Sequence, residues 1–363
     1  MTTISLARGI PAPECLPVEE LADCAATALR LDGSTILSYG STLGYTPLRE
    51  WIAERHGVEA ERVFVTNGSL QAFHLVLSSL GEGRVIVERP TYDRPRKVLA
   101  AEGREIAEVT LDEDGLDVDE LEQVCESGLT SAFLYTIPTF QNPAGVTLSA
   151  ARREQLARLI RERSLRVLED DPYGLVRFEG EPLPTLFELE GGEHVMYGSS
   201  FSKTVAPGLR VGYMIVPAGL AADLEPLVAS TYITPALVAQ ATLYEFLRRG
   251  LFEANVERVC GLLRARRDAM LEALEQELGG RATWSRPEGG YFLWLELPEE
   301  IDTTGLLSAA GEAGVTFVPG PDFGGAPNTA RLAFSFVSPD EIAEGVRRLA
   351  QLMPASPAAV ELG

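Results

Sequence analysis

The stretch SFSKTVAPGLRVGY, residues 200–213, holds one of only two lysines in a chain of 363 residues. Of the 31 lysines and arginines, 29 are arginine, so the chain uses arginine where a surface cation is needed. A lysine that reacts with a carbonyl group has no such substitute, because a guanidinium group stays protonated and is a poor nucleophile. If the protein carries out amine–carbonyl chemistry, Lys203 must perform it. Lys97, in the charged stretch RPRKVLAAEG, is expected at the surface.

Two groups of small polar residues favour a phosphate site near this lysine. Ser200 and Ser202 offer hydroxyl groups, and Arg210 offers a planar fork of donors that matches phosphate oxygens. In TNGSLQAF, Gly68 and Ser69 follow an expected strand and open an expected helix. The first backbone N–H groups and the dipole of such a helix attract anions. Each signal is weak alone, but both predict the same kind of ligand.

Bulk composition argues against several classes of protein. The net charge of −22 disfavours nucleic-acid binding, because a phosphate backbone requires a basic surface. No run of 18 apolar residues and no signal-peptide core is present, so we expect a cytoplasmic protein without a membrane span. The four cysteines form no CxxC pair and the three histidines are scattered, so we expect reduced cysteines and no metal site.

Apolar, β-rich runs alternate with helical patterns through the middle of the chain. Expected strands lie within residues 62–68, 84–90, 131–138, 165–173, 194–202 and 211–217. Expected helices lie within residues 69–81, 93–103 and 149–164, the last with Ser149 as its N-cap. This alternation predicts an α/β fold with a mainly parallel central sheet flanked by helices.

The pattern changes after about residue 220. Helical stretches at 218–250 and 253–279 are followed by apolar strand patterns at 289–298, 314–320 and 329–337 and by a helix at 339–353. This mixture predicts a smaller α+β domain. We expect a large domain at residues 35–250 and a small domain made of residues 1–34 and 251–363.

Four motifs in a fixed order give the chain a family resemblance. They are TNGS (66–69), QNPAG (141–145), EDDPYG (169–174) and SFSKTVAPGLRVGY (200–213). Their combination resembles the fold-type-I pyridoxal 5'-phosphate (PLP) enzymes. Within these it is most similar to the aminotransferase branch that includes aminoadipate and kynurenine aminotransferases and the C-terminal domains of related transcription regulators. The resemblance covers roughly residues 5–350 and implies PLP as the cofactor.

The resemblance implies roles around the cofactor ring. Lys203 corresponds to the catalytic lysine that forms a Schiff base with PLP. Asp170 corresponds to the acid that keeps the pyridinium nitrogen protonated, so that the ring accepts electrons. Asp171 is the competing candidate, but its side chain is expected on the opposite face of an extended segment. Tyr92 in RPTYD corresponds to the active-site aromatic residue stacked on the ring.

The other cofactor contacts follow in the same way. Asn142 and Tyr173 correspond to residues that hydrogen-bond the phenolic oxygen of PLP. A phosphate cup is implied at Gly68, Ser69, Leu70, Ser200, Ser202 and Arg210. Leu70 stands where relatives often have glutamine, so its contact with the phosphate comes from the backbone.

Substrate binding and assembly are implied as well. Arg331 in TARLAFSF corresponds to the arginine that pairs with the substrate α-carboxylate, and Asn142 is expected to bind the substrate as well. Tyr39 in LSYGSTLGYTPLRE resembles the tyrosine that reaches the phosphate of the neighbouring subunit, which implies a homodimer with shared active sites. Without the family motifs, Asn142 would be interpreted as a turn residue, Tyr92 as a core tyrosine and Arg331 as a surface arginine.

The expected function is the transfer of an amino group between an L-amino acid and a 2-oxo acid through a Schiff base at Lys203. A PLP-dependent lyase, cyclase or oxidase of amino-acid-derived metabolism is one alternative, because the same cofactor site serves several reactions. A regulatory PLP-binding domain is another. Relatives of that kind carry a basic winged-helix module in front, which we do not expect here because the resemblance begins near residue 5.

Overall fold

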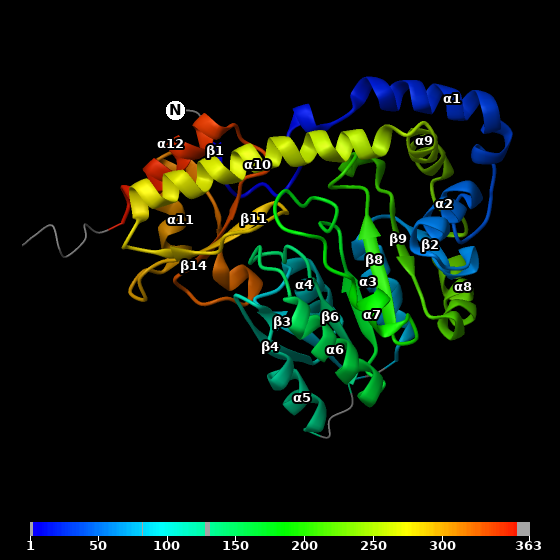
Figure 1. Cartoon of the computed structure of the whole chain (residues 1–363), viewed down its shortest axis with the longest axis horizontal. Helices are drawn as coiled ribbons and strands as arrows, with labels where there is room; N and C mark the ends of the chain where they lie inside the picture. The colour runs from blue at the N-terminus through cyan, green and yellow to red at the C-terminus, as the bar shows by residue number, and fades with distance from the viewer. Residues whose placement is uncertain (1–2, 82, 128–130, 354–363) are drawn as a thin grey trace, which may run out of the picture.

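The computed structural model describes residues 3–81, 83–127 and 131–353, which form a large part around an eight-stranded sheet and a smaller part around a four-stranded sheet (Figure 1). The strand order of the large sheet is β2-β9-β8-β7-β6-β3-β4-β5. Its strands are β2 (Val63–Thr66), β3 (Arg84–Arg89), β4 (Ile106–Asp112), β5 (Gly115–Leu116), β6 (Ser131–Thr136), β7 (Val167–Asp170), β8 (Val195–Ser200) and β9 (Gly212–Ile215).

The central strands of this sheet run in one direction. β8, β7, β6, β3 and β4 pair in parallel, whereas β9 and β5 are antiparallel to the strands beside them. A parallel strand requires cover on both faces, and the sequence provides it through helices between successive strands. The predicted α/β fold with a mainly parallel sheet is confirmed.

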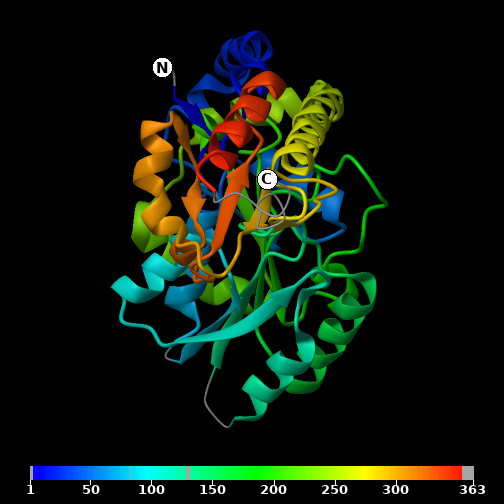
Figure 2. The same ribbon diagram turned by 90° about the vertical axis from the view of Figure 1, so that its left-hand side faces the viewer.

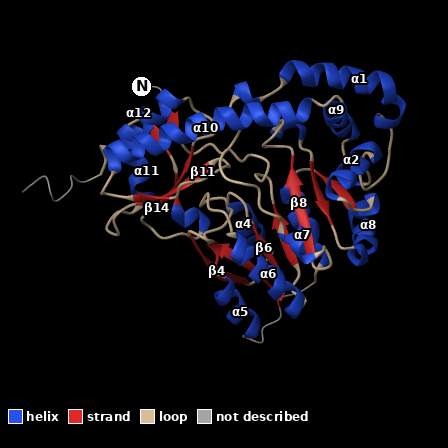
Figure 3. Ribbon diagram, in the orientation of Figure 1, coloured by secondary structure: helices blue, strands red, loops and turns tan. Residues whose placement is uncertain are grey.

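Residues of β3 show how the sheet joins two cores. Val85 and Val87 pack on the face covered by Phe73, while Ile86 packs on the opposite face with Leu156. The first face is covered by α3 (Ser69–Ser79), α4 (Asp93–Ala101) and α8 (Ala218–Tyr232). The second is covered by α2 (Thr46–His56), α5 (Val118–Glu126), α6 (Ala150–Arg163), α7 (Leu186–Glu190) and α9 (Leu237–Arg248) (Figure 3).

The smaller part is an antiparallel sheet with helices on it. Its strand order is β10-β11-β14-β13, with β10 (Thr283–Trp284), β11 (Phe292–Glu296), β13 (Val318–Pro319) and β14 (Thr329–Ala333). The associated helices are α10 (Leu251–Leu278), α11 (Thr303–Glu312) and α12 (Pro339–Ala350). A two-stranded parallel sheet joins β1 (Ile4–Ser5) to β12 (Val315–Thr316). The long helix α10 runs along both parts, and α12 packs beside it (Figures 1 and 2).

Two features refine the expectations from the sequence. The helical pattern at 218–250 is divided into α8 and α9, because Ile233 adopts a positive φ of 62° and Pro235 follows it. Helix α1 (Val18–Ile36), placed in the small domain by prediction, packs against α9 of the large part. The proposed boundaries near residues 34 and 250 remain a prediction.

Neither membrane helices nor metal clusters occur in the part of the chain that the structure describes. No helix there is long and apolar enough to cross a bilayer. Nor do three or more His, Cys, Asp or Glu side chains gather there in a way that could hold a metal ion.

Candidate active site

A cavity of about 410 Å³ lies where β7 and β8 end, between the two parts of the molecule. Ligands of open α/β sheets bind at the carboxyl ends of the strands, and this volume is typical of a small-molecule site. All of the predicted site residues except Tyr39 line it: Gly68, Ser69, Leu70, Tyr92, Asn142, Asp170, Tyr173, Ser200, Ser202, Lys203, Arg210 and Arg331. Tyr39 follows α1, and its side chain is 83% exposed.

Lys203 presents its amine to this cavity. Its Nζ donates a hydrogen bond to the Gly9 carbonyl oxygen at 2.8 Å and lies 4.9 Å from the centre of the Tyr291 ring. The Tyr291 hydroxyl donates to the main-chain oxygen of Lys203 at 2.9 Å, which fixes the backbone of the loop. Removal from water, and then the charges of Arg331 and Arg210, lower the pKa of Lys203 to about 7. A large fraction of the amine is therefore uncharged near neutral pH, as a nucleophile requires.

Asp170 ends β7 opposite this amine. Its Oδ2 accepts a hydrogen bond from the Tyr135 hydroxyl at 2.8 Å, whereas Oδ1 is buried and has no hydrogen-bond partner among the described residues. Burial raises the pKa of Asp170 to about 7, although the nearby hydroxyl groups of Tyr135 and Ser69 act to lower it. A buried carboxylate oxygen without a donor fits a cationic ligand group, which would lower that pKa again.

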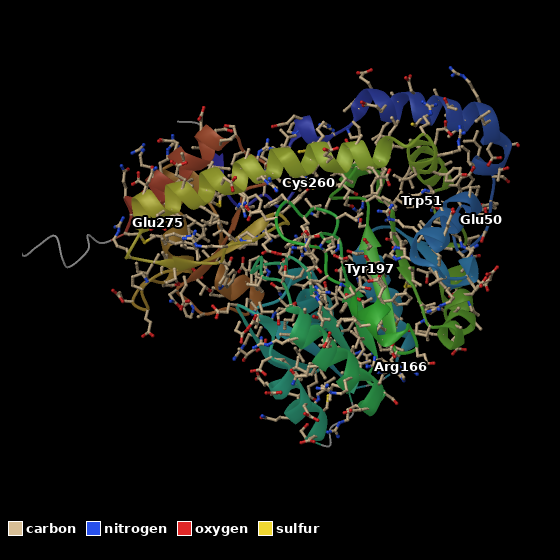
Figure 4. The ribbon with its side chains drawn as sticks, viewed as in Figure 1. Glu50, Trp51, Arg166, Tyr197, Cys260 and Glu275 are labelled. Carbon is tan, nitrogen blue, oxygen red and sulfur yellow. The ribbon has the colours of Figure 1, made fainter. Side chains whose placement is uncertain are left out.

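Asp171, the competing candidate, points to the other side of the chain. Its Oδ2 accepts from the hydroxyl of Tyr197, which lies on β8 (Figure 4), at 3.0 Å. Its Oδ1 accepts from the Gly174 backbone N–H at 2.7 Å. Alternation along an extended segment therefore directs Asp170 into the cavity and engages Asp171 in the fold.

The residues of the predicted phosphate cup lie around Gly68 and Arg210. Gly68 precedes α3 with φ 85°, and a Cβ added there would lie 2.3 Å from Nη2 of Arg210. That nitrogen donates to the Asn67 carbonyl oxygen at 2.9 Å. The Ser200 hydroxyl donates to Oγ of Ser202 at 2.8 Å. Hydroxyl groups, a guanidinium group and the first turn of a helix thus converge on one end of the cavity.

Arg331 occupies the opposite end, on β14. Its Nη1 donates to Oδ1 of Asn142 at 3.0 Å and its Nη2 to the Ala7 carbonyl oxygen at 2.9 Å. The guanidinium carbon lies 4.2 Å from the centre of the Phe292 ring and 4.8 Å from that of Phe323. Nε is buried and has no hydrogen-bond partner in residues 3–81, 83–127 and 131–353. The group is therefore a cation held in place by aromatic rings, which suits a carboxylate ligand.

Several contacts of the site were not identified from the sequence. Gly9 accepts the lysine hydrogen bond, and Tyr135 orients Asp170. Phe292 lines the cavity, and Tyr291 donates to the main-chain oxygen of Lys203. The strand pattern SAFLYTIP marks Tyr135 only as apolar, and YFLW gives Tyr291 and Phe292 the same appearance. Their roles depend on contacts between segments that are far apart in the chain, so no local signal could have identified them.

The donor set fits PLP. The cup would hold the phosphate, the unpaired oxygen of Asp170 would face the ring nitrogen, and Lys203 would meet the aldehyde carbon. These three groups stand at separate positions of a single cavity, which defines a PLP-dependent enzyme of fold type I.

Comparisons with known proteins give the family. Residues 4–349 match the family model described as aminotransferase class I and II, so the chain belongs to this family of PLP-dependent aminotransferases. It is 40% identical to the 2-aminoadipate transaminase of Thermus thermophilus, over 96% of this chain and 90% of that protein. It is 36% identical to aromatic-amino-acid aminotransferase 1 of Thermococcus litoralis, over 96% of this chain and 87% of that protein.

A solved structure agrees with the sequence relatives. The crystal structure of LysN, the α-aminoadipate aminotransferase of Thermus thermophilus complexed with N-(5'-phosphopyridoxyl)-L-leucine, superimposes with a TM-score of 0.91. It is 39% identical to this chain and the match covers 96% of this chain and 92% of that one. The protein is an aminotransferase, and the alternative of a lyase, cyclase or oxidase is not favoured.

Proposed function

We propose that the protein exchanges an amino group between an L-amino acid and a 2-oxo acid in the 410 Å³ cavity, with Lys203 as the residue that holds PLP covalently. The observation that carries this assignment is a lysine whose pKa is lowered to about 7, beside an anion-binding cup and opposite a buried carboxylate oxygen that no described residue hydrogen-bonds. The only other lysine of the sequence, Lys97, pairs with Asp93 at 2.6 Å and is 60% exposed.

Each remaining residue has a task in binding or proton transfer. PLP, when bound, supplies an electron-accepting ring that stabilises negative charge at the substrate Cα. Asp170 would keep a proton on the ring nitrogen, and Tyr92 would stack on the ring face. Asn142 and Tyr173 would donate hydrogen bonds to the phenolic oxygen, and the cup would hold the phosphate. Lys203 Nζ would act as the base that takes the proton from the substrate Cα.

Arg331 binds the α-carboxylate of the substrate. Its aromatic neighbours hold the guanidinium plane, and its bond to Oδ1 of Asn142 couples substrate binding to the residue beside the cofactor. The Nη2 atom donates to Ala7 O and the Lys203 amine to Gly9 O, so residues 7–9 are the segment that an incoming substrate displaces.

The amino donor is an amino acid with an extended side chain. Relatives 40% and 36% identical are named for 2-aminoadipate and for aromatic amino acids. Beyond the cofactor contacts, the cavity is lined by a mixed apolar and charged group that suits such side chains: Gly9, Ile10, Asp93, Arg94 and Pro207.

The assembly is a cytoplasmic homodimer with shared active sites. Leu31, Leu37 and Tyr39 lie together in sequence around the end of α1 and are 71%, 72% and 83% exposed. Large exposed apolar side chains grouped in this way are typical of a surface that a partner covers. Tyr39 of one subunit would then reach the phosphate cup of the other.

The test is a product balance with purified protein, PLP and a panel of amino donors offered with one 2-oxo acid. Transamination predicts one 2-oxo acid formed from the donor for each amino acid formed from the acceptor. Release of ammonia or peroxide in place of the transferred amine would contradict the proposed reaction.

A further inference from the structure

Glu88 is a buried acid just outside the cavity, and nothing in the proposed mechanism uses it. It lies near the end of β3, its side chain is 1% exposed, and it forms no ion pair within the described residues. Burial raises its pKa, partly offset by its hydrogen bonds. A charged group at such a position carries a cost unless all of its oxygens are satisfied. Its partners therefore indicate why it is there.

Both carboxylate oxygens of Glu88 accept hydrogen bonds from the chain that leads to Asn142. Oε1 accepts from the hydroxyl of Thr136 and from the Ile137 backbone N–H, the latter at 2.9 Å. Oε2 accepts from Nε2 of Gln141 at 2.6 Å. The single acid thus spans the start and the end of the segment 136–141, which joins β6 to Asn142.

The orientation of the Gln141 amide is fixed by two further bonds. Its Oε1 accepts from the Ala144 backbone N–H at 2.8 Å, and its Nε2 donates to the Pro90 carbonyl oxygen at 2.9 Å. Because a backbone N–H cannot accept, Oε1 must face Ala144 and Nε2 must face Glu88. Each oxygen of Glu88 therefore meets an obligatory donor, Ile137 N–H on one side and Gln141 NH₂ on the other.

This network holds three cofactor-facing groups at once. Gln141 directly precedes Asn142, which accepts from Arg331 at 3.0 Å. Pro90 stands two residues before Tyr92 in the same loop. Thr136 follows Tyr135, whose hydroxyl donates to Asp170 at 2.8 Å. These segments approach the cavity from different directions. Glu88 bonds to Thr136 and Gln141 directly, and Gln141 links it to Pro90.

We propose that Glu88 is a positioning residue of the aminotransferase site, which sets the place of Asn142 against the cofactor. The inference rests on the proposed role of Asn142. Through it, Glu88 governs the hydrogen bond to the phenolic oxygen of PLP and the seat of Arg331, while it touches neither cofactor nor substrate.

The test is Glu88→Gln in the PLP-loaded protein. An amide offers one acceptor and one donor, so it sets NH₂ against either Ile137 N–H or Gln141 NH₂ and moves the segment. A displacement of about 1 Å at such a site lowers kcat/KM by about 100-fold. Loss of the donor leaves more negative charge on the phenolic oxygen, which then holds the proton on the nitrogen joining Lys203 to PLP more strongly. The visible absorption of PLP changes when this proton is lost, so the pH midpoint of that change should rise by about 0.5–1 unit.

The matched control is Glu169→Gln. Glu169 is also 1% exposed, and its two oxygens accept from the backbone N–H groups of Leu186 at 3.0 Å and Phe187 at 2.9 Å, outside the cavity. The Glu169→Gln variant should lose about as much thermal stability as Glu88→Gln but keep the absorption midpoint of the parent protein. If Glu88→Gln leaves midpoint and kcat/KM unchanged, or if Glu169→Gln changes them equally, the positioning role is overturned.

A reciprocal variant sharpens the result. In Glu88→Gln/Gln141→Glu the new amide donates to the new carboxylate and accepts from Ile137 N–H, while the carboxylate still accepts from Ala144 N–H. The second carboxylate oxygen then faces the Pro90 carbonyl oxygen, and two acceptors repel each other, so only part of the midpoint shift should be recovered. Partial recovery supports the proposal. Asn142→Ala separates a failure of the positioning role of Glu88 from a failure of the proposed role of Asn142. If the midpoint moves in Asn142→Ala but not in Glu88→Gln, the positioning role alone is overturned. If it moves in neither variant, the role of Asn142 is overturned as well.

Discussion

The two ends of the cavity are built in different ways. At the phosphate end, Thr66 and Ser200 both pair in register with Gly212, so β2, β9 and β8 bring the cup together through the sheet. A Cβ on Gly212 would lie 2.9 Å from the Cα of Gly68, which shows how closely these strands approach. The phosphate end is thus placed by strands that share one sheet, although Arg210 itself remains exposed.

At the substrate end, the contacts connect segments that no sheet register joins. Arg331 reaches Ala7 across 324 residues of sequence and Asn142 across 189. Lys203 reaches Gly9 across 194 residues. One backbone bond, from the Ala333 N–H to the Leu6 carbonyl oxygen at 2.7 Å, and several side-chain bonds of modest net free energy hold this end together. We infer that the substrate end adjusts to its ligand more readily than the phosphate end, which the sheet holds.

Lys203→Ala should have the largest effect on turnover, since it removes the reacting amine, which lies between the two ends of the cavity. We expect transamination to fall by at least about 10⁴-fold. Lys97→Ala is the control, because Lys97 is 60% exposed and contacts only Asp93 among the described ion pairs. Turnover with several amino donors measures both. Full turnover of Lys203→Ala would defeat the assignment, and so would the absence of a pyridoxyl adduct on Lys203 of the parent protein after borohydride reduction and peptide mapping.

Asp170→Asn should lower turnover by about 10²–10³-fold, because an amide does not hold a proton on the ring nitrogen. In the cofactor-free protein the same substitution should increase the stability of the fold. The pKa of Asp170 is raised from 3.8 to about 7 by folding. Ionisation of its carboxyl group therefore lowers the stability of the fold progressively as the pH rises from about 4 to 7, and the loss is complete above about pH 7. The variant should therefore be more stable than the parent at pH 8, on the order of 1–2 kcal/mol, with the gain shrinking toward pH 4. Urea unfolding at several pH values measures this.

Arg331→Gln probes the substrate end alone. The loss of a charged pair with the α-carboxylate should raise KM about 10- to 100-fold, with PLP affinity nearly unchanged. Steady-state kinetics and a PLP titration give the two numbers. An equal loss of PLP affinity would remove the distinction between the two ends.

The pH dependence of PLP capture tests the amine itself. Because burial lowers the pKa of Lys203 to about 7, the uncharged fraction falls about tenfold for each pH unit below that value. The rate at which the cofactor-free protein gains the visible band should follow this slope and level off above about pH 7. A rate that keeps rising toward pH 10 would mean an amine of ordinary basicity.

Tyr39→Phe should have the smallest effect. Loss of one hydrogen bond to the charged phosphate would weaken PLP binding about tenfold. The ring is retained, so sedimentation should show an unchanged oligomeric state. Unchanged PLP affinity in an intact dimer would show that the phosphate end is complete within one subunit.

Some parts of the site could be predicted from the sequence and others could not. Lys203, Asp170 and the phosphate cup lie in short motifs whose residue types follow from their chemistry, so they could be proposed from sequence and they line one cavity. Neither Glu88 nor the hydrogen bond that Gly9 accepts from Lys203 could be proposed. A glutamate in RVIVERP looks like the polar end of a strand, and a glycine in ARGIPAP looks like a turn. Their functions exist only because distant segments donate to them.

The sequence by itself determined the alternation that makes a parallel sheet, the one lysine fit for carbonyl chemistry and the motif order that gives the family. These depend on periodicity and on side-chain chemistry, which are local properties. The tertiary structure decided which of two adjacent aspartates faces the cavity, how far the amine is removed from water and which carbonyl groups hold Lys203 and Arg331. Those features depend on burial and on contacts between segments up to 324 residues apart, which no local pattern records.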